Sequence, residues 1–363
     1  MGISELQHSQ QNNIAVERAR HIVSLKGWNS TSYQILNPGI RRWFSQSGDA
    51  VTGYVTTRRA WVVVGAPVCT IERLKEVVSE FESEAARDNM RVCYLCAEAR
   101  LEAVFSNSTT HAKVLLGAQP VWNPQNWAVC VSKNRSLRKQ LNRAHNKNVF
   151  VTEWSAERAF ANTELLNCLH EWLKGKGLPP MHFMVEPETL SRLFDRRIFV
   201  AERDGAVVGF VMLSPVPMRN GWLFEQYVHS PDSPNGTVEL MIDAAMRALS
   251  NGQSEYATLG LSPLSTRAEI EPFRNPVWLS LLLTWIRAHG RRFYNFEGLD
   301  SFKAKFRPER WEPVFAISNE PRLSPSTLYA IASAFSRNAP IRLFLGGLRR
   351  AVRSEIRWLI QKL

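Results

Sequence analysis

Two short segments hold side chains whose types and spacing suit the binding of phosphate groups. In residues 302–307, FKAKFR, the cations Lys303, Lys305 and Arg307 alternate with aromatic or small residues. Lys303 and Lys305 share a face if the segment is extended, whereas Lys303 and Arg307 share one if it is helical. Both conformations predict a compact positive cluster suited to a phosphate or a lipid headgroup. The alternative is a solvated basic face.

The second segment is the turn PNGT at residues 234–237, which precedes a predicted helix. The first amide groups of a helix lack intrahelical partners, so they attract a phosphate or stabilise an oxyanion. The candidate binding residues are Asn235, Gly236 and Thr237. The alternative is that Asn235 or Thr237 simply caps the helix.

A predicted helix at residues 135–147 is dense in cations. They are Arg135, Arg138, Lys139, Arg143 and Lys147. Such a helix suits the backbone phosphates of RNA, with an affinity that falls as salt rises. No known RNA-binding module is visible in the sequence, so recognition of RNA would depend on shape and charge. The alternative is an exposed helix that links two domains.

The C-terminal segment 340–363 predicts a basic amphipathic helix. Its apolar residues recur on one helical face, and its arginines gather on the other. The residues expected to contact a membrane are Arg349, Arg350, Arg353, Arg357 and Trp358. A helix of this kind suits the interface of an anionic membrane. The alternative is a terminal helix packed on the domain, with its arginines in solvent.

Composition narrows the class of protein. The chain has 363 residues and a formal net charge of +12, which favours polyanionic partners such as nucleic acid or anionic lipid. It contains no 18-residue apolar run, and its polar first residues lack the apolar core of a secretion signal. Its five cysteines are scattered, which indicates a reducing compartment. No His/Cys cluster has metal-ligand spacing, so neither a metal nor another cofactor is expected.

The elements that position these segments form two similar blocks. In the first, two strands at residues 50–65 precede a helix at 71–85, a strand at 91–97 and a strand at 112–116. The second begins with a strand at 149–154 and helices at 157–173 and 187–194. The remaining expected elements are a hairpin turning at Asp204-Gly205, strands at 222–228, 256–259 and 314–317, and helices at 238–249 and 276–289.

This order resembles the GNAT acyltransferase fold, and it occurs twice. We therefore expect an α/β protein with a tandem, duplicated GNAT-like fold and a C-terminal amphipathic helix. The expected divisions are a polar tail at 1–19, a first GNAT-like domain at 20–149, a second, catalytic one at 150–320 and a helical region at 321–363. The pyrophosphate motif Gln/Arg-x-x-Gly-x-Gly/Ala is not found before the helix at 238–249, which weakens acetyl-CoA as a donor.

Three strings carry a more specific resemblance. They are SLRKQLNRAHNKNV at 136–149, FVAERDGAVVGFVMLSPV with the later SPDSPNGTVELMIDAAMRAL, and FYNFEGLDSFKAKFRPERWEP at 293–313. From about residue 20 to residue 320 the chain resembles the C-terminal domain of phosphatidylglycerol lysyltransferases. The typical member carries an N-terminal multi-span flippase domain, and this chain resembles the stand-alone, soluble form.

The resemblance implies transfer of an amino acid from aminoacyl-tRNA to the hydroxyl of phosphatidylglycerol or a related lipid. It places that reaction in the cytoplasm, at the inner face of the cell membrane. Arg135, Arg138, Lys139 and Arg143 would then contact the tRNA, and Asn295 and Arg307 would join PNGT in binding substrate.

The same resemblance directs attention to the segment before PNGT, where family members show an acid and an arginine three residues apart. Here Glu225 and His229 stand four apart instead. With Lys303 and Lys305 they are the expected catalytic residues, because the acceptor hydroxyl must be oriented and the tetrahedral oxyanion stabilised. The alternative is that Glu225 and His229 are ordinary strand-end residues.

Two other functions remain open. One is a GNAT-type N- or O-acyltransferase that uses acyl-CoA or an acyl-carrier protein. The other is a non-enzymatic peripheral membrane or nucleic-acid-binding protein, an interpretation that the altered acid–arginine spacing motivates.

Overall fold

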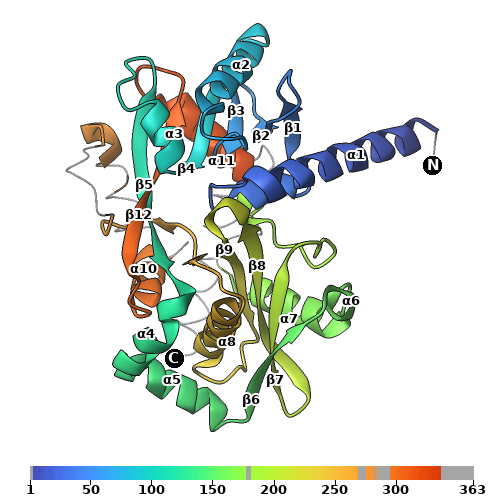
Figure 1. Ribbon diagram of the computed structural model, residues 1–363, viewed down its shortest axis with the longest axis vertical. Coiled ribbons are helices and arrows are strands. Elements are labelled where there is room, and N and C mark those ends of the chain that lie inside the picture. The colour runs from blue at the N-terminus through green and yellow to red at the C-terminus, as the bar shows by residue number, and fades with distance from the viewer. Residues whose placement is uncertain (1–2, 177–180, 269–274, 281–282, 284–294, 337–363) are drawn as a thin grey trace, which may run out of the picture.

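A single twisted sheet runs through the whole of the described structure (Figure 1). The structure is a computed structural model that describes residues 3–176, 181–268, 275–280, 283 and 295–336. The 12-stranded sheet has the order β1-β2-β3-β4-β12-β5-β10-β9-β8-β7-β6, with β11 paired to β5. Its strands are β1 Arg41–Phe44, β2 Val51–Thr56, β3 Ala60–Val64, β4 Arg91–Ala97, β5 Ala112–Trp122, β6 Val149–Trp154, β7 Arg197–Arg203, β8 Ala206–Val216, β9 Gly221–His229, β10 Tyr256–Thr258, β11 Ser262–Pro263 and β12 Arg310–Ser318.

The two halves of the chain repeat one arrangement of strands and helix. In the first half, β1, β2 and β3 are antiparallel, and the chain then crosses through α2 (Leu74–Arg87) to β4, which is parallel to β3. In the second half, β6 to β9 are antiparallel, and α8 (Thr237–Asn251) leads to β10, parallel to β9. The molecule is therefore an α/β protein with a duplicated GNAT-like arrangement, as the sequence predicts.

The halves exchange strands with each other. β5, from the first half, pairs with β10 of the second half. β12, near the end of the second half, inserts between β4 and β5 of the first half. The expected division near residue 150 stays a prediction, and one sheet runs across it.

Helices cover both faces of the sheet. In the first half α2 and α3 pack on one face and α1 and α11 on the other; in the second half α8 lies on one face and α7 on the other. The helices within the described residues include α1 Ile3–Lys26, α2, α3 Ala99–Val104, α4 Trp127–Lys133, α5 Arg135–His145, α6 Ala156–Ala159, α7 Thr163–Lys174, α8, α10 Phe296–Ala304 and α11 Pro325–Phe335, with 3-10 turns η1 Ser32–Leu36, η2 Pro124–Asn126, η3 Phe183–Val185 and η4 Pro217–Arg219.

Most of the predicted elements that fall within the described residues are confirmed, and three differ. The helix expected at 276–289 lies largely outside the described residues. The helix expected at 157–173 is two helices, because Asn162 caps a new helix, α7. The helix expected at 187–194 is wrong, because this segment runs as turns. Leu190 and Leu193 in this segment are both buried and have the spacing of one helix face, although the segment is not helical. The N-terminal tail is helical from residue 3 and continues past residue 19 to residue 26.

The tight hairpin between β7 and β8 is confirmed at its turn residues. Asp204 and Gly205 both have positive φ, 52° and 82°. A two-residue turn of this hand matches the twist of the flanking strands. Within the described residues, no helix is long and apolar enough to cross a bilayer.

Candidate functional site

The parallel strands β9 and β10 mark the place where a site can form in the second half. In sheets with parallel strands, ligands lie outside the carboxyl ends of the strands. Lys303 of α10 hydrogen-bonds to the loop that follows β10, at Gly260 and Leu261. The Lys303 Nζ donates to the Gly260 carbonyl oxygen at 2.8 Å and to the Leu261 carbonyl oxygen at 2.9 Å.

Lys303 is the most perturbed cation in this region. It is only 3% exposed, and burial lowers its pKa to about 7, which the nearby Asp300 charge opposes. The low pKa follows because removing an ammonium from water costs free energy that two carbonyl dipoles offset only in part. Near neutral pH, Lys303 therefore changes between its charged and neutral forms while holding the loop after β10.

Lys305 occupies a different place from Lys303. It lies just past the end of α10, and its Nζ is 2.5 Å from Glu239 Oε1 in the first turn of α8. Its ammonium also stands 4.1 Å from the centre of the Phe302 ring. The side chain is 34% exposed, so the ammonium, although paired with Glu239, is still reached from solvent. A cation held at this point suits a developing negative charge.

His229 ends β9 on the way to the first turn of α8. Its Nδ1 lies 3.1 Å from the Ser230 carbonyl oxygen and 3.1 Å from Ser233 Oγ. A carbonyl only accepts, so this contact assigns a proton to Nδ1, and in the neutral imidazole the lone pair is then on Nε2. The ring is half-buried. This is the tautomer that a general base requires.

The turn before α8 is packed against α5. Gly236 has φ +99°, and a Cβ at that position would lie 2.2 Å from the Gln140 carbonyl oxygen. Only glycine allows this close approach. Neither Asn235 nor Thr237 caps the helix; the Thr237 hydroxyl donates to the Pro234 carbonyl at 2.7 Å, and Asn235 is exposed. The predicted helix start is confirmed, and the capping alternative is wrong.

Glu225 has other partners than these groups. It is the extra residue of a bulge in β9, opposite the step from Met212 to Leu213 in β8. Its carboxylate pairs with Arg196, at 2.9 Å between Nε and Oε2, and both side chains are under 10% exposed. It also accepts from Gln34 of η1. Glu225 thus ties η1 to the second half, and its contacts share no residue with those of His229.

The cations of α5 are all exposed. The helix buries Leu137, Leu141 and Ala144 against α8 and turns its charged residues outward. Arg138 donates to the Ser132 carbonyl oxygen. Within the described part of the chain, none of the arginines and lysines of α5 forms an ion pair with an acid. Figure 1 shows α4 and α5 beside α8, at the end of the molecule remote from α2. We refer to Arg135, Lys139 and Arg143 together as the α5 cations.

The remaining predicted substrate residues are placed separately. Asn295 caps α10 by accepting from the Gly298 amide at 2.9 Å, and its side chain is exposed. Arg307 turns away with φ 52° and donates to the Lys133 carbonyl oxygen at 3.0 Å. The three cations of FKAKFR therefore reach three different partners. Arg349, Arg350, Arg353, Arg357 and Trp358 lie outside the described residues.

A buried charged cluster at the junction of the halves was not predicted from the sequence. Arg219 in η4 pairs with Glu98 at 3.3 Å and with Glu312 of β12 at 2.5 Å. Its guanidinium also stacks 3.6 Å from the ring of Tyr256. Burial raises the pKa of Glu98, and the charge of Arg219 only partly opposes this shift. No spacing in the sequence indicates this cluster, because its members come from four separate elements.

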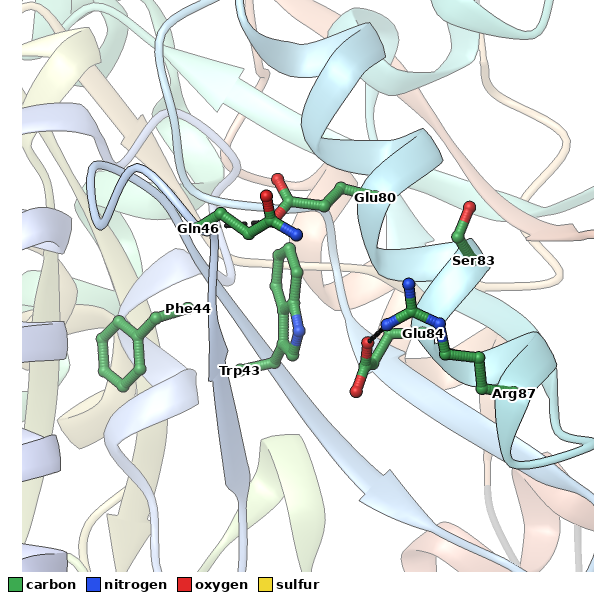
Figure 2. Close-up of a pocket in the computed structure, with 7 residues that line it drawn as sticks. All are labelled: Trp43, Phe44, Gln46, Glu80, Ser83, Glu84 and Arg87. Atoms are coloured by element: carbon green, nitrogen blue, oxygen red, sulfur yellow. Dashed lines mark hydrogen bonds and ion pairs between the residues drawn. The ribbon is translucent and has the colours of Figure 1, made fainter.

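A surface pocket lies at the other end of the molecule, between β1 and α2 (Figure 2). Figure 2 shows the indole of Trp43 among side chains of α2, with Phe44 pointing away from it. Glu80 accepts from the backbone N–H of Gln46 at 2.7 Å, and Glu84 pairs with Arg87 at 2.7 Å. None of the predicted site residues lines this pocket. Among the described residues, no three His, Cys, Asp or Glu side chains are grouped to hold a metal ion.

Comparison with known proteins agrees with this arrangement over most of the chain. The sequence model of the family described as phosphatidylglycerol lysyltransferase, C-terminal, matches residues 20–318. A phosphatidylglycerol lysyltransferase of Bacillus subtilis is 24% identical over 328 residues, which are 89% of this chain. The match spans 37% of that relative, so the chain covers little more than a third of its length.

Two solved structures share the fold. One is the C-terminal domain of a putative lysylphosphatidylglycerol synthetase from Agrobacterium fabrum, with a TM-score of 0.74 at 23% identity, covering 89% of this chain and 96% of that one. The other is L-PGS from Bacillus licheniformis, with a TM-score of 0.74 at 20% identity, covering 88% of this chain and 96% of that one. At these identities the likeness shows the fold.

Proposed function

This chain belongs to the family described as phosphatidylglycerol lysyltransferase, C-terminal, and from that premise we propose that it transfers an aminoacyl group from aminoacyl-tRNA to a lipid hydroxyl. The acceptor is phosphatidylglycerol or a related lipid, at the cytoplasmic face of the membrane. The observation that carries the proposal is the family match itself, because it spans both halves and the segments that hold His229, Lys303 and Lys305.

The reaction is an exchange of esters. The lipid hydroxyl oxygen attacks the ester carbonyl carbon of the donor while His229 Nε2 takes the hydroxyl proton. The Lys305 ammonium, near the first turn of α8, stabilises the tetrahedral oxyanion. The bond to the tRNA ribose then breaks, and that oxygen leaves with the proton returned from His229. The products are an aminoacylated lipid and a free tRNA end.

Other residues position this machinery in the proposal. Lys303 holds the loop after β10, and the Glu225–Arg196 pair holds η1 against β9. Gly236 packs against the Gln140 backbone, so α5 lies beside the start of α8.

A reconstituted assay tests the function. Purified chain, a mixture of radiolabelled aminoacyl-tRNAs and phosphatidylglycerol vesicles are expected to give labelled lipid on a thin-layer plate. Prior digestion of the tRNA with ribonuclease should remove the product. Labelled product that forms from acyl-CoA, or that survives the digestion, would refute the tRNA donor. No product from any charged tRNA or acyl-CoA would favour the non-enzymatic alternative.

The α5 cations are proposed to contact the tRNA backbone, since they are exposed and adjacent to the start of α8. Replacing Arg135, Lys139 and Arg143 with glutamine is expected to raise the KM for charged tRNA about tenfold or more, with little change in kcat. The slope of log affinity against log salt should fall by about 0.7–0.9 for each phosphate that the variant no longer neutralises.

The matched control is glutamine at Arg58, Arg59 and Lys75, three exposed cations of the first half. It removes the same net charge from a surface remote from α8. An equal rise of KM in both variants would show that net charge alone attracts the tRNA, and an unchanged KM in the α5 variant would place the tRNA elsewhere.

A further inference from the structure

Two arginines from different halves of the chain meet at the end of η1. Arg42 belongs to β1 in the first half, and Arg192 belongs to the segment that leads into β7 in the second half. Arg42 donates to the Asn37 carbonyl oxygen and Arg192 donates to the Leu36 carbonyl oxygen, each at 3.4 Å. These two carbonyls are consecutive in the chain, so both guanidiniums reach the same place. We call Arg42 and Arg192 the η1 arginine pair.

Strand alternation directs Arg42 away from the pocket of Figure 2 and toward α1. The next residue, Trp43, packs against Phe81 of α2, with ring centres 5.3 Å apart. Successive side chains of a strand point to opposite faces, so the two neighbours of Trp43 point to the other face. Figure 2 shows this for Phe44. Arg42 accordingly donates to Asn12 Oδ1 of α1, also at 3.4 Å.

The charges of the η1 arginine pair are not neutralised within the described part of the chain. The acids close to the pair already have other partners: Asp195 pairs with Arg20 at 2.7 Å, and Glu225 pairs with Arg196 at 2.9 Å. Neither member of the pair forms an ion pair with a described acid, and their hydrogen bonds go to neutral oxygens. Two like charges are thus held together without a counter-charge.

Arg42 shows what this arrangement costs. Its Nε is shielded from solvent and has no hydrogen-bond partner among the described residues. Burial, together with the nearby charge of Arg192, lowers the pKa of Arg42 to about 10, so the side chain is still charged at neutral pH. Arginines often satisfy the last carbonyls of a helix, but a neutral donor is enough for each carbonyl. An anion between the two guanidiniums would offset their repulsion.

We propose that the η1 arginine pair binds one phosphate group, which then joins β1 of the first half to the segment before β7 of the second. Each guanidinium donates in a planar fork, and a tetrahedral phosphate presents oxygens to two such forks at once. Both arginines are half-buried, so a ligand reaches them from solvent. The pair contains none of the reacting groups, and the inference does not depend on the transfer reaction.

The phosphate can belong to a lipid headgroup or be free in solution, whereas tRNA is disfavoured. Leu193, the neighbour of Arg192 in the chain, packs in the core beneath α7. The helix α5 packs with α8 on the other face of the same sheet. A tRNA that is held by the α5 cations therefore lies on the opposite face from the pair.

Thermal melts of the full chain, in phosphate and in chloride of equal ionic strength, test the site. Millimolar phosphate is expected to raise the melting temperature of the wild type, and the dependence on concentration gives an apparent Kd. Arg42→Gln and Arg192→Gln are each expected to raise this Kd about tenfold, because a charge-assisted hydrogen bond is lost. In chloride alone, Arg192→Gln should melt at or above the wild-type temperature, since repulsion is removed while an amide donor remains. Arg192→Lys keeps the charge without the fork, so its Kd should lie between the two.

The matched control is Arg41→Gln. Arg41 is exposed and precedes Arg42 in β1, so its side chain points to the opposite face of the strand. The control removes the same charge from the same strand, and it should respond to phosphate as the wild type does.

Vesicle co-sedimentation without tRNA identifies the source of the phosphate. Vesicles of phosphatidylglycerol and phosphatidylcholine are compared with vesicles of phosphatidylcholine alone. If the ligand is a lipid headgroup, Arg42→Gln and Arg192→Gln bind the anionic vesicles several-fold more weakly than Arg41→Gln does. If it is a free phosphate, all three variants bind the vesicles equally, while the first two still lose the response to phosphate in the melts.

The proposal is overturned if phosphate leaves the wild-type melting temperature at its chloride value and the vesicles do not distinguish the pair variants from Arg41→Gln. Equal losses in Arg41→Gln would show that net charge alone attracts the anion. A lower melting temperature of Arg192→Gln in chloride, with an unchanged response to phosphate, would show that this arginine only caps η1. Loss of tRNA binding in the pair variants, without any response to phosphate, would assign the pair to RNA. None of these measurements requires a donor, so each outcome stands whether or not the chain proves to be a transferase.

Discussion

Replacing Lys303 with methionine is expected to flatten the pH dependence of stability between pH 7 and 8.5. In the folded protein the pKa of Lys303 is lowered to about 7, whereas an unfolded lysine has a pKa of 10.5. Over this interval the unfolded chain holds a proton that the folded chain has lost. The free energy of unfolding therefore rises with pH through this residue, by at most about 1.4 kcal/mol per pH unit.

The methionine variant lacks this titration but keeps the length of the side chain. We compare the free energy of unfolding of the variant and the wild type by urea denaturation. The difference, variant minus wild type, should increase by up to about 2 kcal/mol as the pH falls from 8.5 to 7. Removing the hydrogen bonds to Gly260 and Leu261 adds an offset that does not depend on pH. Lys305→Met is the control, because Lys305 is one-third exposed in the same segment. Parallel curves for wild type and Lys303→Met would contradict the low pKa.

The second large effect is expected at the Glu225–Arg196 pair. Glu225→Leu leaves the Arg196 guanidinium buried without its carboxylate, and the free energy of unfolding should fall by about 3–5 kcal/mol. Arg196→Met should cost a similar amount. The double variant should recover most of the loss, because two apolar side chains replace two charges that had to leave water.

Transfer activity of the double variant separates two roles for Glu225. A positioning residue predicts that activity follows the fraction of folded protein, so the double variant regains most of it. A double variant that is stable yet inactive would show that the carboxylate acts on substrate. Additive stability losses would contradict the coupling of the pair itself.

Local patterns in the sequence predict the elements that carry strong local signals. The Asp204-Gly205 hairpin, the strand that becomes β4 and the basic helix α5 follow from turn chemistry and from hydrophobic period. The helix predicted at 187–194 rests on the same kind of signal, hydrophobic spacing, and is wrong. Leu190 and Leu193 have a helical spacing, but their burial comes from packing against distant strands.

The site was predicted in its residue types more than in its geometry. The sequence places Lys303, Lys305 and Arg307 in one string and predicts a single cluster, yet the end of α10 at Ala304 sends each to a different partner. Glu225 and His229 likewise separate at a bulge that no sequence pattern announces. The partner of Glu225 is an arginine 29 residues away in the chain. Pairings of this kind depend on tertiary contacts, which spacing does not encode.

The position of β12 has a consequence for the order in which the protein can be made. On a growing chain, β4 and β5 emerge from the ribosome long before residues 310–318 exist to fill the gap between them. Until then both strands present unpaired edges, which favour aggregation. Contacts between segments this distant in sequence also form slowly. The strands of the N-terminal repeat therefore complete their pairing only after nearly the whole chain has been made. A nascent chain halted before residue 310 is expected to need a chaperone.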